Sequence, residues 1–565
     1  MATCREQAKF GTITTHTERH FYRWSDPWPG SLDEVAAQTG RTGKAGSPSD
    51  QARLTAGMCT HRNLLALLQS FTLFTTDSRG RTHKVVARYQ QFRAVHKALE
   101  RMAKGETPAQ RGGIVWHTQG SGKSLTMVFV VRELRRRAGL LDWKVVFVTD
   151  RTQLEDQLGE TSIGIGQHVV AAENIAHLKE LLRDPSSNCV MAMVQKFQER
   201  DLNEILPVLN SSQKVLVMID EAHRGEYKLL GANLRRALPG ATHVAYTGTP
   251  IDKTEQTFGD YIDQYTMRQA QEDGVTLEIV YEGRTHAAEV SDSAAMDAKF
   301  QDVFSDYRLE DRLRILGFGT RDAYLDADST IKAKARDMVR HYARQVFPGG
   351  YKAQVVAHSR IAAVRYAREL REALKEEVAS LAQENPLLVI PDELRAVEVA
   401  LVITWANNDE AEIKDAMRGV DTDRVVKRFK LPFDGEDVTG SEKLDGRIGF
   451  VVVNEMLVTG FDAPVEQVLY LDRVIRDHNL LQAIARVNRV HDDGKDCGFV
   501  VDYVGVGNNL RKALDAYAQR EQEEMIACLK PAAELMADLK QALDDTIISR
   551  LMEWARHNHK LVIRP

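Results

Sequence analysis

Short apolar runs alternate with longer polar or helical stretches along most of the chain after about residue 85. A strand buried in a parallel sheet is a continuous apolar run, whereas a helix repeats apolar residues three and four positions apart. The candidate strands fall into two series, at 114–116, 145–149, 190–194, 215–219 and 244–246, and then at 354–357, 399–404, 449–453, 468–471 and 499–502. This alternation predicts an α/β protein with two lobes, each a parallel sheet with helices on both faces.

The same pattern divides the chain into four parts. We expect a lead-in or linker over 1–84, a first lobe over 85–268, a second lobe with a charged helical insertion over 269–507, and a helical C-terminal segment over 508–565. Within the lead-in, residues 25–49 are rich in Pro, Gly, Ser and Thr and are predicted to be a loop. Residues 64–74 form an apolar helix or strand that needs a partner surface, and 89–102 is an amphipathic helix.

Composition restricts the class of protein. With 565 residues, 43% hydrophobic and 27% charged, the chain is typical of globular protein with three or four domains. The net charge of −5 gives no global basic field, although motors bind nucleic acid through local channels. The five cysteines are scattered and odd in number, which indicates a reducing cytoplasm and no structural zinc. No apolar run approaches the roughly 18 residues of a membrane span, and the N-terminus lacks a signal peptide's apolar core.

One stretch, RGGIVWHTQGSGKSLT at 111–126, has the pattern of a phosphate-binding loop. A short strand leads into a small-residue loop, and a helix begins at Lys123, so backbone N–H groups and the positive helix end would face phosphates. Lys123 would reach the β- and γ-phosphates and Ser124 would bind Mg²⁺. The strict pattern has Gly where this chain has His117, and an ordinary strand–helix turn shares the remaining features. The loop residues expected to bind nucleotide are Thr118, Gly120, Ser121 and Gly122.

A second candidate lies at the end of the 215–219 strand, where Asp220 and Glu221 follow directly. Ligands bind at the carboxyl edge of open α/β sheets, so Asp220 would hold Mg²⁺ and Glu221 would polarise the attacking water. An acidic helix N-cap is the alternative. The phosphate loop upstream, with one strand of the right kind between, favours the motor interpretation.

Two weaker signals belong to the same lobe. Thr247 and Thr249 close a strand, where they could sense the nucleotide, although Gly-Thr-Pro is also a common turn. Gln90 could read the adenine edge with its paired donor and acceptor, although a surface helix start explains it equally well.

The second lobe offers arginines. Gln482, Arg486 and Arg489 are spaced four and three apart in DHNLLQAIARVNRV at 477–490, so they should share one helix face. Such arginines are usually a solvated stripe. Here they could be arginine fingers that stabilise phosphoryl-transfer charge.

Together these residues resemble a superfamily 2 motor with two RecA-like lobes of the P-loop NTPase class, and more narrowly the R (HsdR) subunit of type I restriction enzymes. The matching segments are RYQQFRAV, IVWHTQGSGKSLTM, FVTDRTQLEDQ, VQKF, MIDEAHR, AYTGTP, VNEMLVTGFDAP and LDRVIRDHNLLQAIARVNRV. In this family His117 is usual in the loop.

The resemblance implies roles for these residues. Gln90 would read adenine, Lys123 and Ser124 would bind phosphate and Mg²⁺, and Asp220 and Glu221 would handle metal and water. Thr247, Thr249 and Gln482 would couple nucleotide to DNA, Gly460 and Asp462 would contact the nucleotide, and Arg486 and Arg489 would be the fingers. It also implies ATP as fuel, double-stranded DNA as track, and the methyltransferase (M) and specificity (S) subunits as partners in a prokaryotic cytoplasm.

The family also carries an N-terminal nuclease domain, which needs carboxylates and a lysine around Mg²⁺. No candidate precedes residue 85, and Glu412-Ile413-Lys414 is better explained as a solvated helix face. We therefore expect a motor without its nuclease and no DNA cleavage. Another superfamily 2 helicase, a type III restriction motor, or a non-catalytic remnant bound to the methyltransferase complex remain alternatives.

Overall fold

The chain forms two compact units, and each is described by itself. The computed structural model describes residues 2–4, 6–15, 20–40, 47–76, 82–149, 169–193, 206–220, 225–248, 257–284, 326–384, 392–406, 408–439, 442–457, 461, 463–475, 477–491, 494–504 and 529–531. The first unit runs from Met1 to Thr276, and the second begins at Leu277. Helix α12 (Met267–Glu272) therefore belongs to the first unit, although the predicted boundary after residue 268 passes through it.

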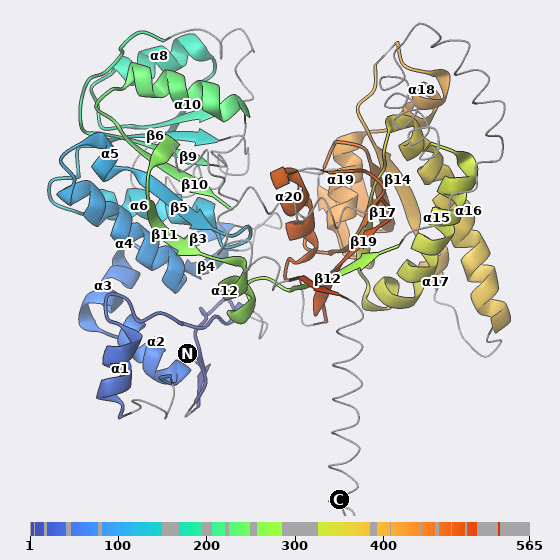
Figure 1. Ribbon diagram of the computed structural model, residues 1–565, viewed down its shortest axis with the longest axis horizontal. Coiled ribbons are helices and arrows are strands. Elements are labelled where there is room, and N and C mark those ends of the chain that lie inside the picture. The colour runs from blue at the N-terminus through green and yellow to red at the C-terminus, as the bar shows by residue number, and fades with distance from the viewer. Residues whose placement is uncertain are drawn as a thin grey trace, which may run out of the picture. The chain divides into compact units, whose positions relative to one another are not determined.

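The first unit is built on a parallel sheet of seven strands, in the order β11-β5-β10-β9-β6-β8-β7 (Figure 1). The strands are β5 (Gly113–His117), β6 (Lys144–Thr149), β7 (Val169–Ala171), β8 (Cys189–Met193), β9 (Val215–Asp220), β10 (Thr242–Thr247) and β11 (Tyr261–Tyr265). All five predicted strands of this lobe are confirmed. The prediction missed β7, an apolar run of only three residues, and β11, whose sequence YIDQY is partly polar.

Helices cover both faces of this sheet, as predicted (Figure 1). Residues of α4 (Tyr89–Lys104) and α6 (Lys123–Leu134) share a buried cluster with one face. Residues of α8 (Ile175–Arg183) and α10 (Gly225–Ala237) share a cluster with the other. Helix α5 (Pro108–Arg111) precedes β5.

The lead-in packs into the first unit and is not a linker. Its elements are β1 (Ala2–Thr3), β2 (Ala8–Lys9), α1 (Leu32–Gln38), α2 (Asp50–Met58), α3 (His61–Gln69), β3 (Thr72–Thr76) and β4 (Thr82–Val86). Helix α1 lies inside the stretch predicted to be a loop, and the Ser31–Glu34 capping box explains why it forms there. Trp24 and Phe71 pack their rings 5.7 and 4.8 Å from that of Phe92 in α4, so one core joins the lead-in to the motor lobe.

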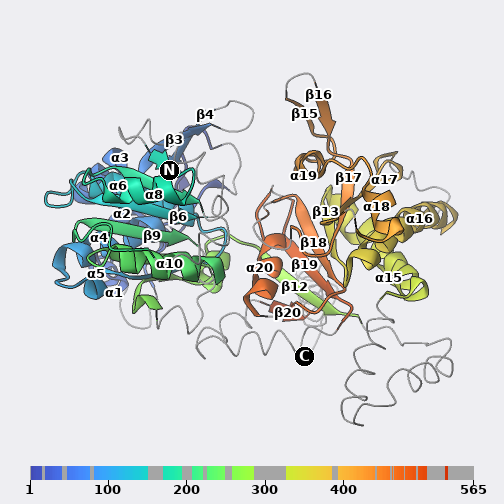
Figure 2. The ribbon, with the colours of Figure 1, turned by 90° about the horizontal axis from the view of Figure 1, so that it is seen from above.

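The second unit repeats the architecture with a parallel sheet in the order β14-β17-β13-β18-β19-β12-β20 (Figure 2). Its strands are β12 (Glu278–Gly283), β13 (Lys352–Val356), β14 (Glu398–Val402), β17 (Ile448–Val453), β18 (Glu466–Leu471), β19 (Cys497–Asp502) and β20 (Leu529–Pro531). The five predicted strands are again present. Strand β12, which pairs with β19 as the chain enters this unit, was not expected.

Helices flank the second sheet as well. Helices α15 (Asp328–His341) and α16 (Arg360–Glu384) share the main buried cluster with one face, and α20 (Asp477–Val487) contacts β18 and β19. The remaining elements are the π-helix Tyr342–Val346, the 3-10 turn Phe347–Gly349, α17 (Asp392–Arg395), α18 (Ala411–Met417), α19 (Thr422–Lys430) and the hairpin of β15 (Glu436–Thr439) with β16 (Glu442–Asp445). Apart from β20, the predicted C-terminal helical segment lies outside the described residues.

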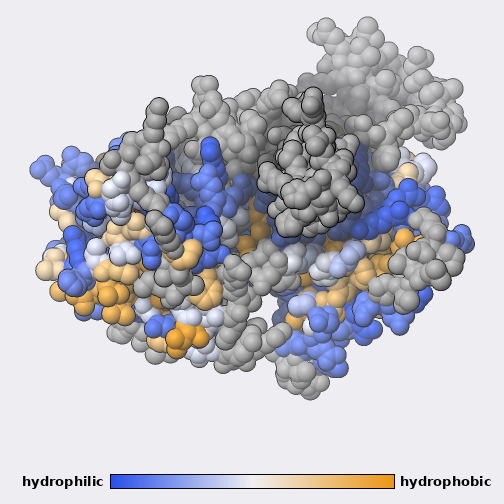
Figure 3. Space-filling view, turned by 90° about the horizontal axis from the view of Figure 1, so that it is seen from below, coloured by the Kyte–Doolittle hydropathy of each residue, from blue (hydrophilic) through white to orange (hydrophobic). Residues whose placement is uncertain are grey.

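Two expectations about the surface can be compared with the structure. None of the helices in the described residues is long and apolar enough to cross a membrane, and the face in Figure 3 mixes hydrophilic with scattered hydrophobic residues. Glu412 lies on α18, where its carboxylate is within 3.8 Å of Arg365 and 3.6 Å of Arg368. The predicted solvated helix face is therefore partly solvated and carries ion pairs.

Candidate functional site

The phosphate-binding loop joins the buried strand β5 to α6 and has the backbone shape that its glycines allow. Gly120 and Gly122 have φ of 88° and 86°, a left-handed conformation that favours glycine. The Ser121 hydroxyl donates to Thr118 O at 2.6 Å, and the Thr118 amide donates to Tyr265 O at 2.9 Å. The loop is thus fixed from inside and from β11, and the first turn of α6, whose N–H groups have no carbonyl partner within the helix, follows it.

Lys123 is buried against its own loop. Its side chain donates from Nζ to His117 O at 3.3 Å. The turn after β10 passes so close that a Cβ on Gly248 would lie 3.0 Å from that nitrogen and 3.2 Å from Gln119 N. A side chain at 248 would therefore crowd Lys123 and Gln119 unless they shifted slightly. Ser124 lies half-buried at the next position of the helix.

The acidic candidate and the threonine candidate end the neighbouring strands. In the sheet, Tyr246 pairs with Asp220 and Thr247 pairs with Trp116, so β9, β10 and β5 end at the same edge. Asp220 and Thr247 are both buried. The expected meeting of these residues at the carboxyl edge is confirmed for the described ones, whereas Glu221 and Thr249 lie outside the described residues.

The donor set at this edge fits Mg²⁺. A serine hydroxyl and an aspartate carboxylate provide hard oxygen ligands, and Mg²⁺ usually takes one or two protein oxygens beside waters and substrate phosphates. Throughout the described part of the chain, no group of three or more His, Cys, Asp or Glu side chains could hold a metal by itself.

His117, the departure from the strict loop pattern, is bound beneath the loop by a buried carboxylate. Its Nε2 lies 2.9 Å from Asp263 of β11. Burial lowers the pKa of His117, so the ring is neutral and donates to the carboxylate. Burial alone would raise the pKa of Asp263, but the hydrogen bond from His117 and the charge of Arg93 hold it well below its usual range.

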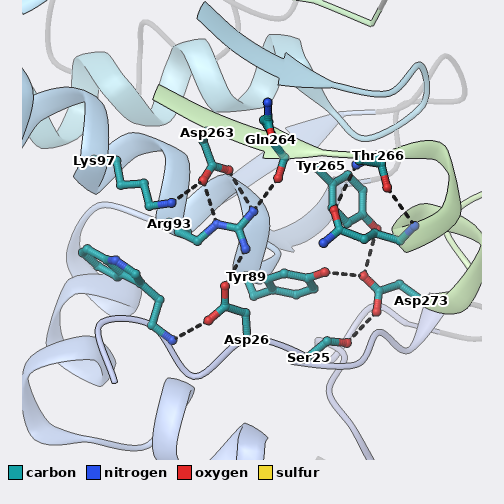
Figure 4. A network of polar contacts seen from close by, with 12 residues as sticks. Ser25, Asp26, Tyr89, Arg93, Lys97, Asp263, Gln264, Tyr265, Thr266 and Asp273 are labelled. Carbon is teal, nitrogen blue, oxygen red and sulfur yellow. Dashed lines mark hydrogen bonds and ion pairs between the residues drawn. The ribbon is translucent and has the colours of Figure 1, made fainter. Parts of the chain in front are cut away.

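Arg93 of α4 completes this cluster and extends it to the lead-in (Figure 4). Its Nε and Nη2 donate to the two carboxylate oxygens of Asp263 at 2.8 and 3.0 Å, and Nη2 also donates to Gln264 O at 2.8 Å. Lys97 donates to the same carboxylate at 2.9 Å. The Nη1 group of Arg93 binds Asp26 in the lead-in. Sequence reasoning missed Asp263 and Arg93, because nothing in YIDQY or QFRAV sets them apart.

A second carboxylate ties the same three segments together. Tyr89 and Tyr265 donate to Asp273 Oδ2 at 2.6 and 2.9 Å, and Ser25 donates to Oδ1 (Figure 4). Burial, followed by the nearby Asp273 charge, raises the pKa of both tyrosines, so they remain hydroxyl donors.

Of the two adjacent glutamines, it is Gln91 that reaches the phosphate loop. Its Nε2 donates to Gly122 O at 3.0 Å and its Oε1 accepts from Arg88 N at 2.9 Å. Gln91 and Gly122 also line a cavity of about 500 Å³. Gln90 does not line this cavity; it is buried, and its Nε2 has no hydrogen-bond partner among the described residues. Gln91, and not the predicted Gln90, therefore contacts the loop, and the adenine-reading role of Gln90 stays a prediction.

In the second unit, the helix expected to carry Gln482, Arg486 and Arg489 ends earlier than predicted. Helix α20 ends at Val487, so Arg489 lies beyond the helix and does not share its face with Gln482 and Arg486. Arg486 is only 3% exposed and donates to Phe461 O, which excludes a solvated stripe. Gly460 and Asp462 lie outside the described residues. The finger role of both arginines stays a prediction.

Polar side chains brace the carboxyl edge of the second sheet. Asn454 Nδ2 donates to Ala357 O and His358 O, both at 3.0 Å, and Arg473 Nη1 donates to Asn454 O at 2.9 Å. These bonds join the ends of β13, β17 and β18, so the segment that follows β17 starts from a fixed position.

Comparison with known proteins finds two family models. Residues 90–313 match the SWI2/SNF2 ATPase, and residues 349–505 match type I restriction enzyme subunit R domain 3. The HindI type I restriction enzyme endonuclease subunit of Haemophilus influenzae is 30% identical over 547 residues, covering 92% of this chain and 48% of that protein.

Other relatives agree. The MjaIXP endonuclease subunit of Methanocaldococcus jannaschii, provisionally assigned to a type I restriction enzyme, is 30% identical over 500 residues, covering 86% of this chain and 44% of the relative. The SsaAORF53P subunit of Staphylococcus saprophyticus is 25% identical over 511 residues, covering 83% and 51%. The chain spans about half the length of these relatives.

Proposed function

Because this chain is a homologue of type I restriction enzyme R subunits, with their ATPase and domain 3 regions, we propose that it is an ATP-driven translocase of double-stranded DNA. The observation that supports this most is positional. The SWI2/SNF2 ATPase match at 90–313 contains the glycine loop, the lysine and the strand-end aspartate that the fold brings to one sheet edge.

The position of each residue at the carboxyl edge of the first sheet suggests its role. The loop N–H groups and Lys123 bind the β- and γ-phosphates, and Ser124 with Asp220 would hold Mg²⁺, which neutralises charge on the phosphates. Glu221, next in sequence, would orient the attacking water. Thr247 lies on the strand between the lysine and aspartate strands, where it can report the state of the phosphates.

Catalysis by such a site depends on groups that are positioned before the reaction begins. The buried bond from His117 to Asp263 and the bond from Gln91 to Gly122 hold the loop from two sides. In the second unit, Arg486 and Arg489 are proposed to stabilise the transition state, with Gly460 and Asp462 contacting the nucleotide and Gln482 coupling it to DNA.

The partners follow from the family. We propose that the chain works with the M and S subunits of a type I restriction complex in a prokaryotic cytoplasm, and that sequence recognition belongs to those partners. We do not propose DNA cleavage for the residues of this chain, because the nuclease of the family belongs to a separate domain of the R subunit.

The test is ATP hydrolysis by the full chain with and without long duplex DNA. We expect DNA to stimulate hydrolysis, and Lys123→Ala or Glu221→Gln to reduce the stimulated rate by about 100-fold or more, as loss of one transition-state contact typically does. Lys104→Ala, at the exposed end of α4, is the matched lysine control and should keep the wild-type rate.

The outcomes separate the candidate functions. Displacement of a third strand from duplex DNA, without unwinding of a forked substrate, supports translocation, whereas unwinding of the fork would indicate a helicase. Hydrolysis that does not respond to duplex DNA contradicts the proposal. Co-purification with M and S subunits without any ATPase activity would identify a non-catalytic binding module.

A further inference from the structure

The segment that follows β17, residues 454–464, is held to the rest of the second unit through its backbone oxygens. Four side chains from other elements of this unit each donate to a carbonyl of the segment: Arg473 to Asn454 O at 2.9 Å, Gln354 to Leu457 O at 3.3 Å, Arg486 to Phe461 O, and Lys495 to Pro464 O at 2.8 Å. Positions along the whole segment are therefore set by side chains that lie outside it.

Within this segment, Leu457 has a backbone conformation that leucine rarely adopts. Its φ is 59°, and every other described residue with a positive φ is a glycine. In this left-handed region the Cβ of an L-residue crowds the backbone, so the conformation is unfavourable unless surrounding contacts maintain it. Residues of this kind concentrate at functional sites, where the strain is part of how the site is built.

The contact that holds Leu457 comes from the middle of the second sheet. Gln354 lies in β13, between Val451 of β17 and Leu469 of β18, and its side chain is buried (Figure 2). Its Nε2 donates to Leu457 O, whereas its Oε1 is buried without a hydrogen-bond partner among the described residues. One end of the amide thus binds the strained residue.

The stability of the sheet does not explain a glutamine at this position. Burying an amide costs free energy unless its polar atoms are hydrogen-bonded, and the residues that pair with Gln354 on both flanking strands are apolar. A methionine of similar length would fill the space without that cost. The benefit that remains for the glutamine is its bond to Leu457.

We propose that Gln354 is a positioning residue for ATP hydrolysis, and that its bond keeps Leu457 in the left-handed turn. The turn sets the direction in which the chain leaves β17 toward Gly460 and Asp462, the residues proposed to contact the nucleotide. The same segment bears Phe461, whose carbonyl binds Arg486, so the proposed finger is positioned through it as well. This inference rests on the proposed function. It adds a buried residue of the sheet that acts on hydrolysis only through the segment.

Steady-state ATP hydrolysis by the full chain with long duplex DNA tests this inference. We expect Gln354→Met to lower kcat about tenfold or more, the scale of a small misplacement of catalytic groups, and to leave KM within about twofold. KM should change little, because the contacts of the phosphate loop to ATP are not altered. An unchanged kcat in Gln354→Met would contradict the inference while the ATPase activity of the wild type stands.

Gln467→Met is the matched control. Gln467 is also a buried strand glutamine whose Nε2 donates to a backbone carbonyl, Cys497 O at 3.1 Å, and whose Oε1 lacks a partner among the described residues. Its bond lies where β18 and β19 begin, at the opposite end of the sheet from the segment. We expect this variant to keep the wild-type kcat. An equal loss in both variants would mean a general weakening of the sheet and would overturn the role given to Gln354.

Relief of the strain at Leu457 provides a second test. Glycine adopts the left-handed conformation readily, so adding Leu457→Gly to Gln354→Met should return kcat to within about threefold of the wild type. A double variant as slow as Gln354→Met would show that the bond does not act through this turn, and the inference would be wrong.

Hydrogen exchange separates this inference from the proposed function, because it needs no ATP. Gln354→Met should speed the exchange of amides at 455–463, and Gln467→Met should not. Unchanged exchange in Gln354→Met would contradict the inference. If the wild type hydrolyses no ATP with duplex DNA, the proposed function fails, and the role of Gln354 in hydrolysis fails with it, even where exchange shows that the bond holds the segment.

Discussion

A buried aspartate in each unit pairs with cationic side chains, but the two carboxylates, Asp263 and Asp472, have different partners. In the first unit, Asp263 receives Arg93, Lys97 and His117, and its pKa is held below the usual range against the effect of burial. In the second, Asp472 binds one lysine, Lys334, and the Tyr366 hydroxyl at 2.6 Å.

The pKa of Asp472 moves in the opposite direction from that of Asp263. Burial raises its pKa, and one lysine with one hydroxyl does not reverse the shift. The comparison teaches that the number and geometry of donors, and not burial alone, decide in which direction the pKa of a buried carboxylate moves. The charged cluster lies beneath the phosphate loop, where a fixed negative group orients His117.

The largest effect is expected from Arg93→Ala. It leaves Asp263 buried without its bidentate partner and frees Asp26, so it should destabilise the first unit by about 3–5 kcal/mol. Urea unfolding followed by tryptophan fluorescence measures this, because Trp24, Trp28, Trp116 and Trp143 belong to that unit. Arg336→Ala, which breaks an exposed pair with Glu376, is the control. Equal effects of the two substitutions would refute the role assigned to Arg93.

An intermediate effect is expected when either buried aspartate is replaced by asparagine, because this should change how the stability of its unit depends on pH. The folded pKa of Asp263 is lowered, so its stabilisation is present above the unfolded pKa near 4 and is lost as pH falls through the folded value. The folded pKa of Asp472 is raised, so its contribution is present below the unfolded pKa and is lost as pH rises through the folded value. Asp263→Asn should flatten the loss of stability that begins as pH falls below about 5 and continues toward the folded pKa.

Asp472→Asn should instead remove a decline in stability of the second unit as pH rises from about 4. Urea midpoints for the first unit, and limited proteolysis with mass spectrometry for the second, give the two slopes. Slopes of the same sign in both units would show that the carboxylates do not differ as described.

The smallest effect is expected from Lys97→Ala. The Lys97 side chain is 39% exposed, and Asp263 keeps Arg93 and His117, so the cost should be below about 1 kcal/mol. The same urea titration measures it. A loss as large as that of Arg93→Ala would mean that the lysine and not the bidentate arginine keeps Asp263 charged.

The sequence was sufficient for most of the two sheets and for the phosphate edge. Strands such as β9 are continuous apolar runs, and loop glycines with Lys-Ser after them have few alternative explanations. The short β7, the polar β11 and β12 were missed, because their positions depend on neighbours that complete the sheet. Helix α1 was missed because its capping box was outweighed by the glycines and prolines around it.

Parts of the site were beyond sequence reasoning for a different reason. Neighbouring residues on a helix point about 100° apart, so the choice between Gln90 and Gln91 depends on the phase of α4 against the loop. Asp263 and Asp26 are ordinary acidic residues, and only the fold brings them to the same guanidinium. The end of α20 at Val487, which separates Arg489 from Arg486, likewise has no clear signal in the sequence.

The bond from Asp26 to Arg93 also affects which fragments of the protein can fold when they are expressed alone. The α/β pattern begins near residue 85, which invites an expression boundary there. A recombinant fragment cut at that point would lose the carboxylate that shares Arg93 with Asp263, and it would expose Phe92 to water by removing Trp24 and Phe71. A fragment meant to keep the first unit folded is therefore expected to need the lead-in together with the α/β region.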